Sequence, residues 1–340
     1  MTLADRIMVD WYLPRHTLLT ASLRPVSLLF RLAVAIRRAL YRGGLLRSVR
    51  LPVPVVVVGN ITVGGSGKTP LVAALARALA QRGFSPGIVS RGYGRDRDGR
   101  APILVAPGDD PARVGDEPLL LARGGYPVVV AKDRVAAGHE LLARHPACDV
   151  ILADDGLQHY RLARSVEIAV VDAGRGPGNG SLLPAGPLRE PASRLDEVDA
   201  VVALIAAEGG APVVRPGAFT MALAAGNFRR IDDPRITAPA SSFAGRDVHA
   251  VAGIGNPARF FATLDAMGIS ATPHPFPDHH RFVAADLAIA GARAILMTEK
   301  DAVKCERFAD ERCWCLPVQA RVDDALVALI EGKLRGPQAA

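Results

Sequence analysis

The sequence predicts an α/β fold, in which a larger domain built on a parallel sheet precedes a smaller α/β domain. Two apolar, β-branched runs, at 53–58 and 148–153, have the composition of strands buried on both faces of a parallel sheet. The first run leads through a glycine-rich turn into an alanine- and leucine-rich helix over 70–82, which Gly83 ends. The 340 residues are well above the length of a typical domain, so we expect two domains.

The positive charge of the chain is concentrated in its first 50 residues. The net charge is +7, from 41 basic and 34 acidic residues. Residues 1–50 hold nine arginines and two aspartates, which alone give 9 − 2 = +7, so the rest of the chain is neutral. This distribution argues against a protein-wide nucleic-acid surface. It separates a basic arm (1–50) from a first domain (51–225) and a second domain that starts with a linker strand (226–340).

Within the arm, 25–42 is predicted to be an amphipathic helix. On a helical wheel, apolar residues fall within about an 80° arc and arginines fall roughly opposite. The apolar positions are Leu29, Leu32, Ile36 and Leu40, and the basic ones are Arg24, Arg31, Arg38 and Arg42. Such a helix either lies in the interface of an anionic membrane or packs on its own domain with a solvated basic face. The pattern alone leaves both open.

The turn after the first strand has the features of a nucleotide phosphate-binding loop. Its glycines let backbone N–H groups point at phosphate oxygens, the lysine reaches the β- and γ-phosphates, and the threonine hydroxyl is placed to bind Mg²⁺. The residues concerned are Thr62, Val63, Gly64, Gly65, Ser66, Gly67, Lys68 and Thr69. Thr62 departs from the strict pattern, which has glycine at that position. The larger domain is therefore predicted to be P-loop NTPase-like and to bind a nucleoside triphosphate.

Asp154 and Asp155 follow the second apolar run. A strand that delivers a carboxylate at its C-terminal edge is how phosphate-loop enzymes hold their metal ion, so Thr69 and one of the two aspartates are candidate Mg²⁺ ligands. A solvated turn is the alternative. The loops at 90–95 and 114–118 are expected at the same edge of the sheet.

The smaller domain is predicted from strands at 228–231, 249–252 and 294–297. The segment 253–258 resembles a dinucleotide fingerprint, but no acidic residue ends a strand about 20 residues later, so we interpret it as a structural Rossmann-like turn. The charged run 299–301 either closes over the site or caps a helix.

The remaining composition excludes several classes of protein. Four cysteines are too few for a disulfide framework and lack a paired Cys-x-x-Cys, so they are predicted to be reduced core residues. These are Cys148, Cys305, Cys313 and Cys315. No run reaches the roughly 18 apolar residues of a membrane span, and arginines interrupt the N-terminal apolar runs, which argues against a signal peptide.

Seven blocks, in order, resemble the tetraacyldisaccharide 4′-kinases, the lipid A 4′-kinases, and the resemblance extends over about residues 10–318. They are Gly59–Pro70, Ser90–Gly94, Gly115–Glu117, Asp154–His159, Gly178–Gly180, Leu183–Pro191 and Asp278–His279. The resemblance implies transfer of the γ-phosphate of ATP to the 4′-hydroxyl of a tetraacylated glucosamine disaccharide 1-phosphate, with Mg²⁺. It also implies a peripheral enzyme at the cytoplasmic face of the bacterial inner membrane, which favours docking of the basic arm on anionic lipid.

The resemblance further implies that Asp116 is the general base, paired with His279 where the two domains meet. The alternatives are a helix N-cap for Asp116 and a proline-stiffened surface loop for His279. Arg189 and Glu190 resemble the substrate and metal-side contacts of the family, with a surface ion pair as the alternative.

Two further residues are predicted to contact the substrate, and two other classes of protein stay open as alternatives. Tyr93 and Arg134 are candidates to contact the disaccharide or its 1-phosphate. Two rival classes remain, a nucleotide-hydrolysing switch and a non-catalytic membrane module; the chain has no Asn-Lys-x-Asp motif for guanine, and no obligate protein partner is evident.

Overall fold

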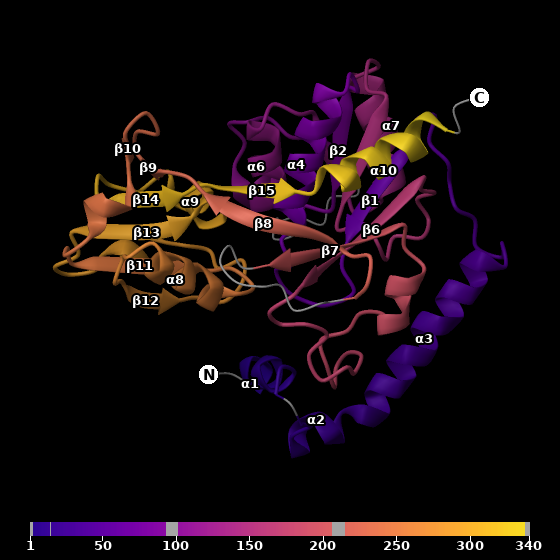
Figure 1. Ribbon diagram of the computed structural model, residues 1–340, viewed down its shortest axis with the longest axis horizontal. Coiled ribbons are helices and arrows are strands. Elements are labelled where there is room, and N and C mark those ends of the chain that lie inside the picture. The colour runs from indigo at the N-terminus through magenta and orange to yellow at the C-terminus, as the bar shows by residue number, and fades with distance from the viewer. Residues whose placement is uncertain (1–2, 14, 93–100, 206–214, 337–340) are drawn as a thin grey trace.

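The computed structural model describes residues 3–13, 15–92, 101–205 and 215–336 of the chain. Figure 1 shows a larger α/β domain, a smaller α/β domain beside it, and an N-terminal arm of helices along the outside of the larger domain. The predicted fold class, a parallel α/β domain with a helical arm and a second α/β domain, is confirmed.

The larger domain is built on a nine-stranded sheet in the order β15-β8-β7-β6-β1-β5-β2-β4-β3. All neighbouring strands are parallel except the two edge pairs, β15 with β8 and β3 with β4. The strands are β1 (Val55–Gly59), β2 (Pro86–Ser90), β3 (Ile103–Leu104), β4 (Val128–Val130), β5 (Val150–Asp154), β6 (Val166–Asp172), β7 (Ala200–Ile205), β8 (Phe219–Ala225) and β15 (Val318–Val322). The central strand β1 is buried along its whole length, which explains its uninterrupted run of valines.

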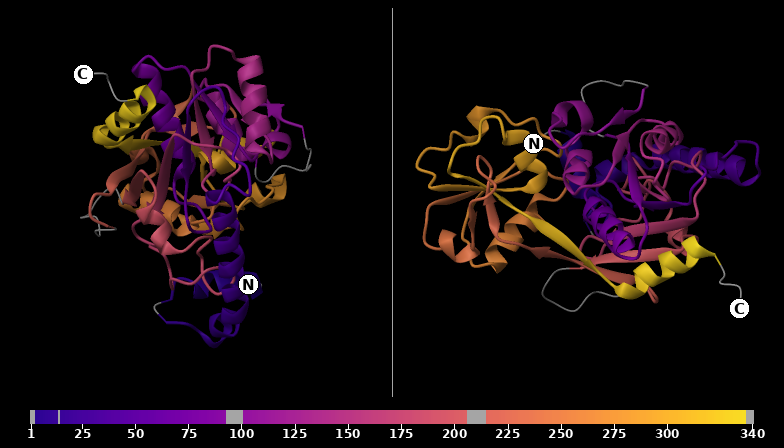
Figure 2. Two further views of the ribbon diagram at one scale, coloured as in Figure 1. Left: turned by 90° about the vertical axis from the view of Figure 1, so that its right-hand side faces the viewer. Right: turned by 90° about the horizontal axis from the view of Figure 1, so that it is seen from above.

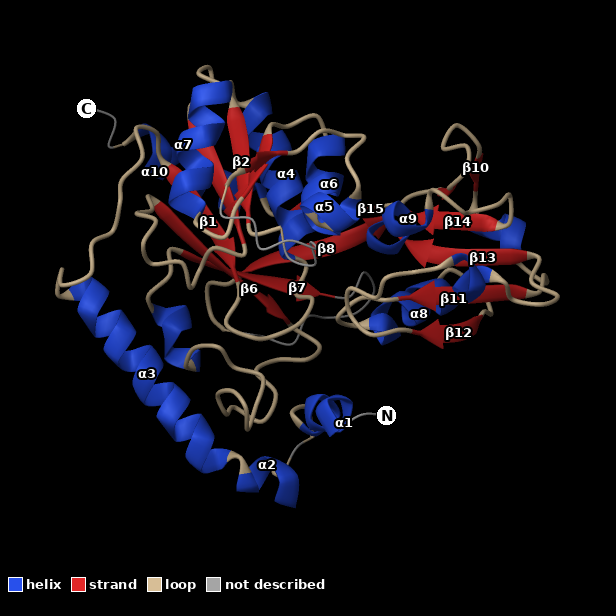
Figure 3. Cartoon of the chain, turned by 180° about the vertical axis from the view of Figure 1, so that it is seen from behind, coloured by secondary structure: helices blue, strands red, loops and turns tan. Residues whose placement is uncertain are grey.

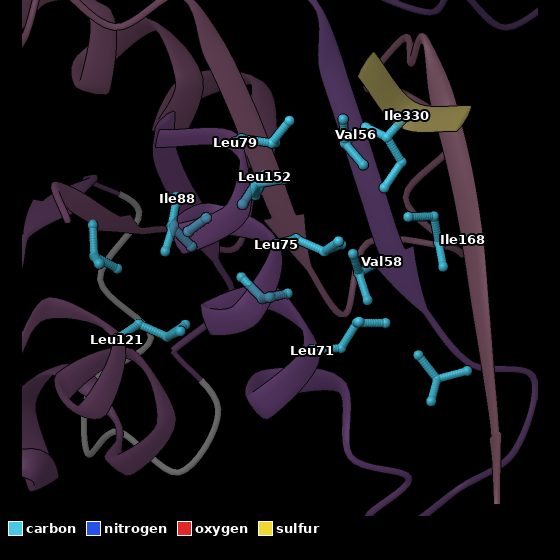
Figure 4. Close-up of a cluster of buried hydrophobic side chains, with 14 of the residues drawn as sticks. Val56, Val58, Leu71, Leu75, Leu79, Ile88, Leu121, Leu152, Ile168 and Ile330 are labelled. Carbon is cyan, nitrogen blue, oxygen red and sulfur yellow. The ribbon is translucent and has the colours of Figure 1, made fainter. Parts of the chain in front are cut away.

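Helices cover both faces of this sheet. They are α4 (Lys68–Gln81), α5 (Pro111–Val114), α6 (Asp116–Arg123), α7 (Arg134–Arg144), α10 (Asp324–Arg335) and the 3-10 helix η1 (Ala192–Asp196). Alternate side chains of β1 divide between the faces. Val56 belongs to one apolar cluster with Leu71 of α4 and Ile330 of α10, as Figure 4 shows. Val57 belongs to the cluster on the opposite face, with Leu141 of α7.

The smaller domain contains a six-stranded sheet in the order β10-β9-β14-β13-β11-β12. Its strands are β9 (Phe228–Arg230), β10 (Thr237–Ala238), β11 (Val248–Ala252), β12 (Thr272–Pro275), β13 (Ala294–Thr298) and β14 (Cys313–Leu316), and its helices are η2 (Ala240–Phe243), α8 (Pro257–Ala266), η3 (Ala284–Leu287) and α9 (Glu299–Cys305). Phe243 packs edge-on against Phe228 and Trp314 in its core. All four cysteines are free and buried, as predicted.

Two short connections join the domains. β8 continues into β9, and β14 continues into β15, which pairs with β8 at the edge of the larger sheet. The sequence-based boundary assigned everything from 226 onward to the smaller domain, whereas the structure returns 318–335 to the larger one. The physical reason is that Leu326 and Ile330 of α10 are fully buried in the core of the larger domain.

The arm consists of α1 (Leu3–Asp10), α2 (Leu18–Ser22) and α3 (Arg24–Arg42). Figures 2 and 3 show α3 on the side of the larger domain remote from the smaller one. Several hydrogen bonds tie the arm to the body. Among them, Trp11 Nε1 donates to the Pro184 carbonyl at 2.9 Å, and the Ser27 hydroxyl donates to the Leu182 carbonyl at 2.7 Å. Among the described residues, no helix has the length and hydrophobicity needed to cross a membrane.

α3 turns its apolar stripe away from the protein. The exposed fractions of Leu29, Leu32 and Ile36 are 69%, 57% and 50%. On the basic side of the helix, Arg38 and Arg42 instead form ion pairs with Glu197 of the larger domain. The alternative placed the apolar face on the protein and the basic face in water. In the structure the apolar stripe is exposed and the basic side contacts the larger domain.

Candidate active site

The glycine-rich loop that the sequence predicts to bind phosphate connects the end of β1 to the start of α4. Gly64 and Gly67 have φ of 104° and 82°, which only glycine adopts without strain. Thr62, where the strict motif has glycine, has no positive φ and pairs with Leu188 in a short antiparallel bridge. Lys68 is the first residue of α4, and a turn at a helix N-terminus has the backbone geometry that suits an anion.

Asp154 ends β5 beside β1, in register with Val58. Its side chain is 1% exposed, and its Oδ1 is buried without a hydrogen-bond partner. The Thr69 hydroxyl donates to Asp154 Oδ2 at 3.4 Å. Burial and the negative charges of Glu117 and Asp155 raise the pKa of Asp154 to about 7. A buried carboxylate oxygen that has no hydrogen-bond partner and lies next to a threonine hydroxyl is suited to a hard cation such as Mg²⁺.

Asp155 has a different environment from its neighbour. It adopts a φ of 48°, and its carboxylate lies 3.5 Å from Lys68 Nζ and accepts hydrogen bonds from Arg189 Nη1 at 3.1 and 3.2 Å. Burial opposes its ionisation, but the cations of Lys68 and Arg189 outweigh burial and hold the pKa of Asp155 below its usual range. The solvated-turn alternative is wrong for both aspartates, because both are tied into the phosphate-loop region.

The structure brings Asp116 and His279 together from the two domains. Asp116 Oδ2 lies 3.2 Å from His279 Nδ1. Asp116 is the first residue of α6, which Gly115 precedes as the N-cap, and its Oδ1 accepts from the Glu117 amide at 2.9 Å. Burial would raise the pKa of Asp116, but the hydrogen bond from His279 and the charge of Lys300 lower it. Asp116 is therefore held as a carboxylate.

Two features of the backbone at His279 fix the position of its side chain. His279 has a φ of 59°, and its amide donates to the Gly253 carbonyl at 3.2 Å, so the loop after β12 is held against the end of β11. Asp155 and His279 are the non-glycine residues with positive φ in the described part of the chain. Such conformations are uncommon, and backbone strain clusters at functional sites.

The predicted substrate contacts meet different outcomes. Arg134 is 5% exposed and donates to the Asp155 carbonyl at 3.1 Å, and burial lowers its pKa to about 10. Arg189 joins the same cluster through Asp155. The structure does not pair Glu190 with the aspartates: its carboxylate accepts from Tyr160 Oη at 2.6 Å and lies 3.2 Å from Arg194 Nε. Tyr93 lies outside the described residues.

The sequence does not predict a role for several charged groups at this edge. Glu117 follows Asp116, and its negative charge helps to raise the pKa of Asp154. His159 lies beside Asp133. Burial and the charge of Arg134 lower the pKa of His159 to about 4. Lys300, in the charged run left open above, reaches Glu117 and His279. Glu117 and His159 belong to blocks that carry the resemblance, which was the available signal.

Within the described part of the chain, no three His, Cys, Asp or Glu side chains converge as a ready-made metal site. A Mg²⁺ ion at Asp154 and Thr69 would therefore complete its coordination with phosphate oxygens and water, which is the usual arrangement for Mg²⁺ in nucleotide sites.

The comparisons with known proteins identify the family of the chain. The model of the family tetraacyldisaccharide-1-P 4′-kinase (LpxK) matches residues 19–335. The chain is 54% identical over 313 residues to a tetraacyldisaccharide 4′-kinase of Azoarcus sp. (strain BH72), covering 92% of this chain and 91% of that protein. It is 53% identical over 333 residues to one of Chromobacterium violaceum, covering 96% of each.

A solved structure gives the same result. The crystal structure of LpxK from Aquifex aeolicus in complex with ATP is similar to this chain with a TM-score of 0.76 at 30% identity, and the match covers 93% of this chain and 100% of that one. The resemblance carried by the seven sequence blocks is thus confirmed, and the chain belongs to the tetraacyldisaccharide-1-P 4′-kinase family.

Proposed function

We propose that this chain phosphorylates the 4′-hydroxyl of a tetraacylated glucosamine disaccharide 1-phosphate while its arm is seated in the cytoplasmic face of the bacterial inner membrane. Family membership makes it an ATP-dependent kinase of lipid A biosynthesis. The residue roles and the membrane seating are the parts that we infer. The observation that carries the residue roles is the Asp116–His279 pair, built by both domains at the same edge as the phosphate loop.

The phosphate loop and its neighbours position the nucleotide. Phosphoryl transfer passes through a loose transition state, so catalysis is mostly alignment and charge neutralisation. Lys68 and the loop amides are placed to hold the β- and γ-phosphates. Thr69 and Asp154 are the residues that would hold Mg²⁺, and the ion would supply neutralisation of the charge on the phosphates. Asp155, already paired with Lys68 and Arg189, orients these cations rather than competing for the metal.

Asp116 accepts the proton of the sugar hydroxyl as the new O–P bond forms. Its carboxylate stays ionised because His279 and Lys300 face it. General-base catalysis of this kind typically contributes about 10²–10⁴-fold. A nucleotide-hydrolysing switch has no need of a base that a second domain orients, so this pair favours transfer to an acceptor alcohol over the switch alternative.

The arm supports the membrane part of the proposal. Twelve of the fifteen large hydrophobic side chains that the described residues expose lie between Leu3 and Leu46. An outward apolar stripe with flanking arginines is typical of a helix lying in a membrane interface. An acylated substrate stays in the bilayer, so a docked arm brings the site to it.

One assay tests the proposed activity. Enzyme is incubated with γ-labelled ATP and tetraacyl disaccharide 1-phosphate in mixed micelles, and lipids and free phosphate are separated. We expect a bis-phosphorylated lipid from the wild type and none from Lys68→Ala. Label released only as inorganic phosphate would favour the hydrolytic switch, and no turnover of ATP at all would favour the non-catalytic membrane module.

A further inference from the structure

Lys300 occupies a central position between the two domains. It is the second residue of α9, which starts at Glu299 after the Thr298 cap. Its Nζ lies 3.1 Å from Glu117 Oε1, 3.3 Å from Asp278 Oδ1 and 3.4 Å from His279 Nε2. Its side chain is only 16% exposed. Lys300 therefore contacts α6 of the larger domain and the His279 loop of its own domain at once.

The contact with His279 has a defined polarity. An ammonium group carries three donors and no acceptor. Since Lys300 can only donate, His279 Nε2 is the unprotonated ring nitrogen that accepts in this contact. A neutral imidazole then carries its hydrogen on Nδ1, which lies 3.2 Å from Asp116 Oδ2. In this tautomer His279 Nδ1 donates to Asp116 Oδ2, and neither ring nitrogen is left to accept a proton from Asp116.

Other charged groups face this pair: Asp278 Oδ1 lies 3.8 Å from His279 Nε2, farther than Lys300 Nζ at 3.4 Å. Lys304, one turn along α9, lies 3.9 Å from Asp116 Oδ2 and 2.7 Å from Asp301. Glu117 and Asp278 are both paired with Lys300.

We propose that Lys300 is a positioning residue that holds His279 in its Nδ1–H tautomer, so that His279 orients Asp116 and does not itself take the substrate proton. The inference rests on the proposed function for its kinetic part. As the acceptor oxygen bonds to the γ-phosphorus of ATP, the bond from that phosphorus to the bridging oxygen of the β-phosphate breaks and ADP leaves; the acceptor O–H proton moves to the Asp116 carboxylate and the imidazole stays unchanged. Because Lys300 and His279 come from the smaller domain and Asp116 from the larger, the tautomer is set where the domains meet.

The tautomer can be read directly in the free enzyme. Protein labelled with ¹⁵N-histidine is examined by NMR, and the His279 signals are assigned by their loss in His279→Gln. We expect an unprotonated Nε2 and a protonated Nδ1 in the wild type and in Lys300→Arg. In Lys300→Met the Nε2 signal should shift toward a protonated or exchanging nitrogen. An Nε2 that is protonated in the wild type, or unchanged by Lys300→Met, would overturn the proposal.

Kinetics with a matched control separate this role from simple domain docking. Arg123 of α6 donates from Nη2 to Oε2 of Glu306, which follows α9, at 2.9 Å. This ion pair joins the same two domains but does not involve Asp116. Displacing a reacting group by about 1 Å costs on the order of 10²-fold in rate. Lys300→Met should therefore lower kcat by about 10- to 100-fold with little change in the KM for ATP, and Lys300→Arg should recover much of it.

The outcomes are distinguishable from failure of the proposed function. Arg123→Met should retain both kcat and the His279 tautomer. An equal loss of kcat in Arg123→Met and Lys300→Met would mean that Lys300 serves only docking, and the proposal would have to be dropped. A wild type that forms no phosphorylated lipid would contradict the proposed function, while the NMR result would still decide the tautomer.

Discussion

Replacing Asp154 with asparagine should stabilise the metal-free protein while disabling it. Burial and the charges of Glu117 and Asp155 raise the pKa of Asp154 to about 7, from an ordinary value of 3.8. Each pKa unit corresponds to about 1.4 kcal/mol, so ionised Asp154 destabilises the fold by a few kcal/mol. Asparagine keeps the shape and removes the charge.

The sign of the pH dependence follows from the raised pKa. Between pH 4 and 7 the folded protein holds a proton on Asp154 that the unfolded chain has released, so this residue makes wild-type stability fall as pH rises through that window. Above about pH 7 the destabilisation is complete. The advantage of Asp154→Asn should therefore be small at pH 5 and fully present at pH 8.

Calorimetry in EDTA measures this advantage. For a domain of 150–250 residues, 1 kcal/mol corresponds to roughly 2–4 °C in Tm, so the transition of the larger domain should rise by several degrees at pH 8. The exposed Asp265→Asn serves as the control and should leave Tm unchanged. Mg²⁺ should raise the Tm of the wild type and not that of Asp154→Asn. Equal Tm values for wild type and Asp154→Asn at pH 8 would refute the burial argument.

The remaining predictions concern catalysis and docking. Lys68→Ala should abolish lipid phosphorylation with an unchanged circular dichroism spectrum; near-normal turnover would remove the phosphate-loop assignment. Asp116→Ala should lower kcat by about 10²–10⁴-fold, and adding His279→Ala should cost little more, because groups acting as a unit give non-additive losses. Multiplying penalties would indicate separate roles. Leu32→Glu with Ile36→Glu should release the enzyme from anionic vesicles in co-sedimentation without changing its turnover of a micellar substrate. Retained sedimentation would show that these side chains do not touch lipid.

Much of this site could be predicted from local sequence because its parts are contiguous. A buried valine strand, the glycine-rich turn and Lys68 at the start of a helix are neighbours in the chain, and their hydrogen bonding and steric needs are local. The same is true of Asp154 at the end of β5. The pattern of α3 was also correct, since 3.6-residue periodicity depends only on the order of residues.

Tertiary structure decided what depends on residues distant in the chain. Asp116 and His279 are 163 positions apart, and only packing of the two domains sets their distance and polarity. Glu190 follows Arg189 directly, yet the backbone directs one to Tyr160 and the other to Asp155. The strand pairing of β15 with β8 placed the C-terminal helix on the first domain. The helical pattern of α3 shows an apolar face and a basic face but does not say which one packs on the protein. The ion pairs of Arg38 and Arg42 with Glu197 put the basic face against the larger domain.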